Sequence, residues 1–234
     1  MIERDQPTIF SDSIVAAVSS ADDNDMGFGR LDNSEVGLNR AVFLQTNDID
    51  PTHATLLQVT YDTTDFCRYR VIDEEHQGEG IHEPVPGAQA DAVVVTRPDH
   101  AVLLPLADCV GAIIYDPINQ ILMVSHLGRH SIEQGGATKS IHYLIENFDS
   151  TPADLLIWLS PAAGGDNYPL HAFANRSMHQ VITGEFLKLG VPFEQIEVSD
   201  VDTTESDDYF SHSEFTAGYR DYDGRFAIVA MMRD

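Results

Sequence analysis

Two periods of apolar residues alternate along this chain, and they predict different elements. Short runs rich in β-branched and apolar residues predict strands, and these cover residues 54–61, 91–96, 101–108, 110–116, 120–126, 154–160, 195–200 and 225–232. Helical spacing predicts two amphipathic helices, one carrying Ile141, Leu144, Ile145 and Phe148, the other carrying Met178, Val181, Ile182 and Leu189 and ending at Gly190. The spacing of Ser131 and Gln134 is that of a capping box, which predicts that the first helix begins near residue 131.

Strands followed by helices predict an α/β (α+β) fold, a sandwich of mixed β-sheets flanked by helices. A length of 234 residues suits one domain, so residues 1–234 are interpreted as a single domain. Residues 73–87 are dense in charge, glycine and proline and lie between two predicted strands. We interpret them as a surface insertion loop within that domain.

The charge of the chain narrows the choice of partners. With 38 acidic and 13 basic residues, the net charge is −25 at pH 7. Such a surface repels nucleic acid and anionic membranes, so we expect neither as a partner. An anionic substrate would need a local cluster of arginines, and the scarcity of lysine suggests adaptation to high salt. The polar N-terminal sequence does not read as a signal peptide, so we expect a cytoplasmic protein with reduced cysteines.

A cysteine and a histidine lie at the ends of two predicted strands. Cys109 follows the strand over 101–108, and His126 ends the strand over 120–126, on the same face as Leu122 and Val124. Sulfur and imidazole nitrogen suit zinc, which takes three or four such ligands. The same pair also suits a nucleophilic cysteine activated by a histidine. A buried pair without a catalytic role fits the spacing too.

The motifs around this pair resemble the laccase-domain family, also described as bacterial polyphenol oxidases and purine nucleoside phosphorylases. "LADC…YDP…MVSHLG" is similar to the family's A-D-C, D-P and H-A-G-W-R-G segments. "GLNRAVFLQTNDIDPTHATLLQVTYDT" is similar to N-R…Q-V-H-G, and "DTTESDDYFSHSEFTAGYRDYDGRFAIVAMM" to D-T…F-F-S-H-R…G-R. The resemblance implies a pocket in which two histidines and a cysteine bind zinc. It further implies phosphorolysis of adenosine and inosine, deamination of adenosine, or oxidation of polyphenols.

The resemblance assigns Cys109 and His126 as metal ligands and catalytic residues, but the third ligand position is Thr60, whose hydroxyl is a poor zinc ligand. Other motif positions also differ, because Trp-Arg-Gly is replaced by Arg129, His130 and Ser131, and the final arginine of F-S-H-R by Ser213. Tyr168 is followed by proline instead of glutamate. These substitutions predict a weakened site.

Other residues are candidates for rebuilding the site. His82 is a candidate third ligand, and without it we expect zinc to bind substoichiometrically; copper is the less expected metal. The substrate-binding candidates are Thr60, Arg129, His130, His212 and Arg30, with Arg225 as a further guanidinium. Arg129 is the candidate contact for a phosphate group.

Three functions remain open at this level. The first is metal-assisted phosphorolysis or deamination of a purine nucleoside, with a nucleoside and phosphate as small-molecule partners. The second is a metal-free Cys–His hydrolase in which His126 activates Cys109. The third is a non-catalytic relative that keeps the fold. The oligomeric state stays open.

Overall fold

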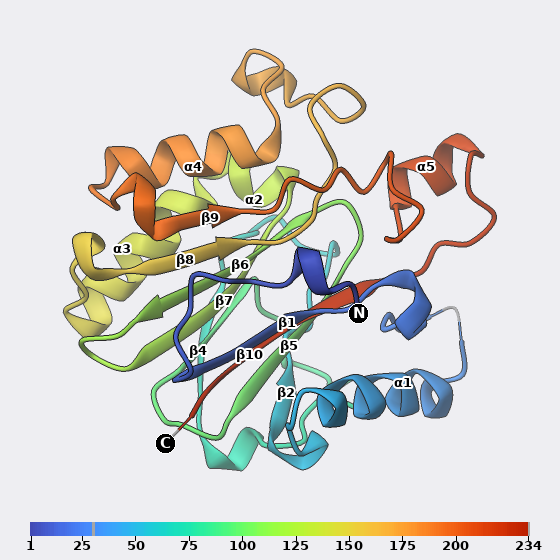
Figure 1. Ribbon diagram of the computed structural model, residues 1–234, viewed down its shortest axis with the longest axis horizontal. Helices are drawn as coiled ribbons and strands as arrows, with labels where there is room; N and C mark the ends of the chain where they lie inside the picture. The colour runs from blue at the N-terminus through green and yellow to red at the C-terminus, as the bar shows by residue number, and fades with distance from the viewer. Residues whose placement is uncertain (30, 234) are drawn as a thin grey trace.

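Two mixed β-sheets pack face to face at the centre of the molecule (Figure 1). The coordinates are a computed structural model, which describes residues 1–29 and 31–233. The first sheet has the order β1-β10-β5-β2, with bounds Ile14–Val18, Phe226–Met232, Ala101–Leu106 and Ala54–Leu56. Its strands are antiparallel except that β2 runs parallel to β5.

The second sheet contains the predicted strands around Cys109 and His126. Its order is β3-β4-β7-β6-β8-β9, with bounds Tyr69–Ile72, Ala92–Val95, Ile121–Leu127, Val110–Asp116, Leu156–Leu159 and Ile196–Val198. The outer pairs β3–β4 and β8–β9 are parallel, and the inner pairs are antiparallel. Mixed pairing in both sheets confirms the predicted sandwich.

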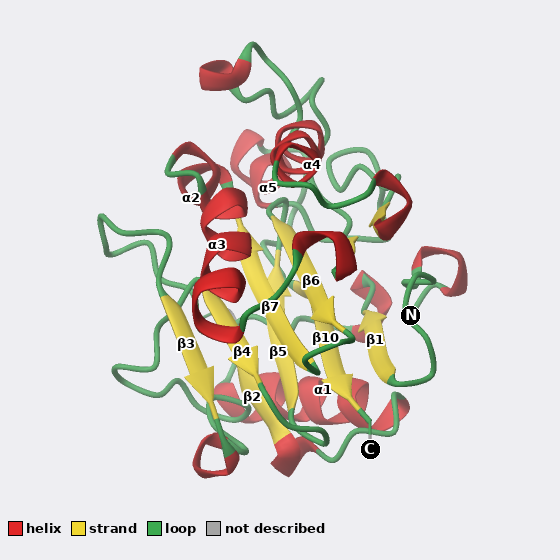
Figure 2. Ribbon diagram, turned by 90° about the vertical axis from the view of Figure 1, so that its left-hand side faces the viewer, coloured by secondary structure: helices red, strands yellow, loops and turns green. Residues whose placement is uncertain are grey.

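In the part of the chain that the structure describes, five α-helices cover the outer faces and one end of the sandwich, namely α1 (Asn33–Thr46), α2 (Arg129–Glu133), α3 (Gly136–Phe148), α4 (Met178–Lys188) and α5 (His212–Ala217). Figure 1 shows α3 and α4 outside the second sheet, α1 outside the first, and α5 beyond the strand ends. Figure 2 shows the same layers from the side. None of the described helices is long and apolar enough to cross a membrane.

Side chains alternate between the two faces of each strand, so the strand residues contribute to three hydrophobic clusters. In β7, Leu122 and Val124 face the first sheet, whereas Met123 and Leu127 pack with the helices of the second sheet. In β5, the alternate residues face either the second sheet or α1. Because His126 follows Leu122 and Val124 at this period, it lies at the end of the apolar row between the sheets.

Some local predictions differ from the structure. The predicted capping box is wrong, because Ser131 lies inside α2, whose N-cap is Gly128. The side chain of Gln134 instead accepts from the Phe66 amide and donates to the Thr64 carbonyl. Helix α1 was not predicted, because exposed Leu38 and Val42 add apolar residues to its outer face and blur its amphipathic pattern.

The segment 73–87 joins β3 to β4 and is only partly at the surface. Gly80 and Ile81 are buried, and Ile81 packs in the core beneath α1. Their carbonyl groups accept hydrogen bonds from the buried Arg40 guanidinium, both at 3.0 Å. This segment therefore closes one side of the sandwich instead of forming a purely surface insertion.

Candidate functional site

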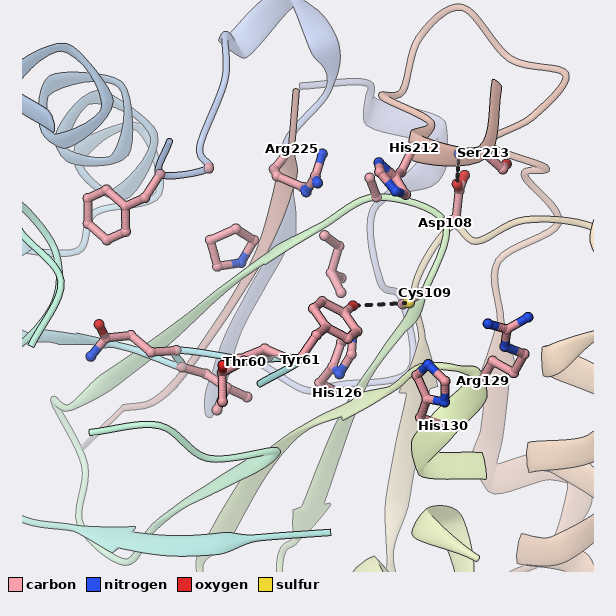
Figure 3. Close-up of a pocket in the computed structure, with 18 of the residues that line it drawn as sticks. Thr60, Tyr61, Asp108, Cys109, His126, Arg129, His130, His212, Ser213 and Arg225 are labelled. Atoms are coloured by element: carbon pink, nitrogen blue, oxygen red, sulfur yellow. Dashed lines mark hydrogen bonds between the residues drawn. The ribbon is translucent and has the colours of Figure 1, made fainter. Parts of the chain in front are cut away.

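A pocket of about 980 Å³ opens where the strands that carry Cys109 and His126 end. Figure 3 shows Tyr61, Cys109 and His126 close together, with Arg225 and His212 on one side and Arg129 and His130 on another. These residues come from five separate parts of the chain, which only the folded structure brings together.

The register of β6 and β7 explains how Cys109 and His126 meet. These antiparallel strands pair Val110 with Leu127, so Cys109, just before β6, lies opposite Gly128, just after β7. A methyl group on Gly128 would lie 2.8 Å from Cys109 Sγ and 3.0 Å from His126 Cε1. The two predicted residues therefore contact the same glycine. Glycine leaves the room that both side chains occupy.

The backbone before Cys109 turns sharply and is held by buried hydrogen bonds. Asp108 has φ of +68°, in the left-handed region that Asp tolerates better than most residues. Its carboxylate accepts from Thr203 Oγ1 at 2.9 Å and from the Ser213 amide at 2.7 Å. Asp108 thereby joins the β5–β6 turn to the beginning of α5, which places Cys109 and His212 around one pocket.

Burial keeps both reactive groups neutral near pH 7. It raises the pKa of the Cys109 thiol to about 11, and Asp108 adds to the rise, although the Tyr61 hydroxyl, Arg225 and the Arg129 amide oppose it. Burial also lowers the pKa of His126 to about 4. The pair is therefore a thiol beside a neutral imidazole, and not a thiolate–imidazolium ion pair.

Aromatic rings line the pocket beside these groups. The Tyr61 hydroxyl lies 4.0 Å from Cys109 Sγ, and its ring meets His126 edge to face at 6.3 Å between centroids. His130 stacks on Phe66 with centroids 4.8 Å apart. Tyr168 contributes another ring to the lining. Such flat surfaces suit a planar heterocyclic ligand.

The other predicted site residues divide between this pocket and places outside it. Thr60, Arg129, His130, His212 and Arg225 all line it. His82 does not, because it lies in a separate depression with Leu31, Asp32 and Leu38. Arg30 lies outside the described residues.

Comparison with known proteins assigns the family. The profile of the family described as multi-copper polyphenol oxidoreductase laccase matches residues 16–181. The chain belongs to this laccase family. No functionally curated protein is significantly similar to it.

Solved structures share the fold over nearly the whole chain. The hypothetical protein YfiH from Bacillus licheniformis is 20% identical, with a TM-score of 0.83, over 94% of this chain and 93% of its own. YlmD from Geobacillus stearothermophilus is 17% identical with a TM-score of 0.83, over 100% and 98%. A Neisseria meningitidis protein is 16% identical with a TM-score of 0.73, covering 98% of each chain. At these identities the likeness shows the fold alone.

The metal implied by the laccase-family resemblance does not fit the donors that this chain supplies. Cys109 and His126 are two ligands of the right kind, but the Thr60 hydroxyl already accepts from the Asp62 amide at 3.2 Å. Among the described residues, no group of three or more His, Cys, Asp or Glu side chains is placed to hold a metal ion. Two protein donors fall short of the three or four that zinc requires.

Several pocket residues of this laccase-family chain were missed by the sequence analysis. Tyr61 ends the predicted strand over 54–61 but was not selected as a site residue, and Phe28 and Arg40 belong to segments far from Cys109 in sequence. Arg40 is buried, lies 3.9 Å over the Phe28 ring and has a pKa lowered to about 9 by burial. The available signal was the N-R pair of the family pattern, which includes Arg40.

A histidine–carboxylate pair completes the pocket wall. His212 Nδ1 lies 3.0 Å from Oδ1 of buried Asp223, and Arg225 donates to the same oxygen at 2.6 Å. Because a carboxylate oxygen accepts hydrogen bonds, this contact favours the tautomer of His212 that carries its proton on Nδ1. Nε2 of His212 is then available to exchange a proton with a ligand.

Proposed function

We propose that this laccase-family protein binds purine nucleosides in the pocket and turns them over slowly, by phosphorolysis or deamination. The observation that carries the proposal is the convergence of Cys109 and His126 on Gly128, beside aromatic walls and guanidinium groups. The pocket volume of about 980 Å³ lies at the upper end of ligand pockets and suits a nucleoside with a phosphate.

In phosphorolysis, the residues of the pocket have separate roles: some bind the phosphate or donate the proton, and others orient the base. In that reaction a phosphate oxygen bonds to C1′ while the bond from C1′ to the base nitrogen breaks, and the departing base takes a proton. Arg225 orients the phosphate by charge-assisted hydrogen bonds. His212 donates the proton from Nε2 when charged, with Nδ1 held by Asp223. Tyr61 and Tyr168 orient the base by ring contacts.

The incomplete metal shell explains why we expect slow turnover. Thr60 replaces the third ligand that the family resemblance implies, so Lewis-acid assistance would be weak. One lost charged interaction costs about 1.5–3 kcal/mol, or roughly one to two decades in rate. We therefore expect adenosine turnover at least about tenfold below that of a relative with a complete His–Cys–His set.

The neutral state of the Cys109–His126 pair argues against a metal-free cysteine hydrolase. Such enzymes need the thiolate, and the Cys109 thiol has a pKa of about 11. The engaged Thr60 hydroxyl favours a different second candidate, a relative that keeps the fold and binds a ligand without catalysis.

The decisive experiment compares adenosine and inosine turnover, with and without phosphate and added zinc, in this protein and in a complete-site relative. His212→Gln removes the assigned proton donor, and Tyr219→Phe, at an exposed position, is the control. Slow turnover that His212→Gln abolishes and Tyr219→Phe leaves unchanged supports the proposal. Binding of adenosine without turnover by the wild type would favour the non-catalytic candidate. Turnover equal to that of the relative would show that other residues have rebuilt the site.

A further inference from the structure

The pocket lining carries more basic than acidic residues, unlike the chain as a whole. Among the described residues, its lining includes the basic residues Arg40, Arg129 and Arg225 but only one acidic residue, Asp108. The Asp108 carboxylate is buried and already accepts two hydrogen bonds from the protein. Because Asp223 pairs with Arg225, the guanidinium groups of Arg40 and Arg129 supply the positive charge at this pocket, in a protein of net charge −25.

Arg129 has no carboxylate partner, unlike six of the other described arginines. Six described arginines have one within ion-pair distance, namely Arg4, Arg68, Arg70, Arg97, Arg220 and Arg225. Among the described residues, no hydrogen bond or ion pair reaches the Arg129 side chain, and Glu133, one turn later on α2, forms no ion pair with it. An unpaired guanidinium at a pocket, in a chain with so many carboxylates, is available to a ligand.

Arg129 and Arg225 lie on different sides of the pocket. Arg225 lies beside His212 and is held by Asp223. Arg129 lies on another side with His130, where the Arg129 amide faces the Cys109 sulfur. A ligand that extends past Cys109 therefore meets a second cationic group, separate from the one that we assign to the phosphate co-substrate.

We propose that the preferred ligand carries its own phosphate, as in a purine nucleoside 5′-monophosphate, and that Arg129 binds this phosphate. The inference rests on the proposed function for the position of the purine ring. Arg129 supplies a planar fork of donors that matches phosphate oxygens. The pocket volume of about 980 Å³ accommodates the additional group.

Calorimetric titration with adenosine, AMP and inorganic phosphate tests the inference in the wild type, Arg129→Gln and Arg97→Gln. Arg97→Gln is the matched charge control, because Arg97 follows β4 at the end where Val95 pairs with Leu122, away from His126. We expect AMP to bind at least tenfold more tightly than adenosine. Arg129→Gln should weaken AMP binding by roughly 10- to 100-fold and change adenosine binding less than about twofold. Arg97→Gln should change neither.

The other outcomes distinguish failure of the inference from failure of the proposed function. Equal binding of AMP and adenosine, with adenosine turned over, would overturn the inference and leave the proposed function intact. Tighter AMP binding without any nucleoside turnover would support the inference and reject the proposed catalysis. Inorganic phosphate that binds through Arg129 and tightens adenosine binding, without a preference for AMP, would assign Arg129 to the co-substrate and overturn the inference. Absence of binding by both nucleoside and nucleotide would reject both proposals.

Discussion

The Tyr61 hydroxyl lies 4.0 Å from the Cys109 sulfur, at the point where the pocket reaches the end of the sandwich. This contact lowers the pKa of the Cys109 thiol, against the larger rise that burial causes. Tyr61 therefore adjusts the reactivity of a cysteine that lies 48 residues later in the sequence.

Tyr61→Phe should make Cys109 less reactive. Removal of the hydroxyl takes away a donor to the thiolate, so the thiol pKa should rise and iodoacetamide should alkylate Cys109 about fivefold more slowly at pH 9, for a bond worth about 1 kcal/mol. The rates are measured in a Cys67→Ser background so that only Cys109 reacts. Tyr219→Phe, at an exposed position, is the control. An unchanged rate in Tyr61→Phe would show that the contact has no electrostatic effect.

Thr60→His should improve zinc binding. The variant would add a third strong donor to Cys109 and His126 at the wall that Thr60 occupies. Because loss of even an outer-shell partner costs about 10- to 100-fold in metal affinity, we expect a gain of at least tenfold. Competition with a chelator measures the affinity, and Thr60→Ala is the control. A gain that is equal in both variants would contradict the shared-pocket geometry.

Gly111→Ala should destabilise the sandwich. A methyl group at Gly111 in β6 would lie 2.5 Å from Ile228 Cδ1 and 2.7 Å from Leu106 Cδ1, both on the opposing sheet. Overpacking of this kind costs about 1–3 kcal/mol in the free energy of unfolding. Gly184→Ala, in α4, is the matched control, because its nearest heavy atom is 3.9 Å away. Urea denaturation checks both variants, and equal stabilities would indicate that the sheets separate at little cost.

Stability should fall on acidification partly because of His100. Its Nε2 lies 2.8 Å from Thr55 Oγ1, and that hydroxyl donates to the His76 carbonyl, so His100 must be the donor in its neutral form. Burial lowers the pKa of His100 from 6.5 to about 4. Between these values the unfolded chain binds more protons, so this contribution is complete above pH 6.5 and decreases as the pH falls towards 4.

His100→Gln removes this titration and keeps a donor for Thr55. Between pH 8 and pH 5, the unfolding free energy of the wild type should decrease by about 2 kcal/mol more than that of the variant. Urea denaturation at the two pH values measures the difference, in which carboxylate contributions cancel. Parallel decreases in both proteins would mean that His100 titrates normally in the folded state.

The sequence alone identified five of the six strands of the second sheet and the residues at its end, but it did not predict β3. Strands β6 and β7 were predicted within one residue of their bounds, because short continuous apolar runs are typical of buried strands. The same runs end at Cys109 and His126, and antiparallel pairing of consecutive strands brings their adjacent ends together. The laccase-family motifs added Thr60, Arg129 and His212, all of which line the pocket.

The tertiary structure alone decided which distant segments complete the site. It placed Tyr61 against Cys109, held His212 by Asp223, and put His82 in another depression. Neither hydrophobic period nor motif order encodes these relations, because loop positions depend on how two sheets and their connections pack. Local periodicity determined the strands of this protein, whereas long-range packing determined the chemistry at their ends.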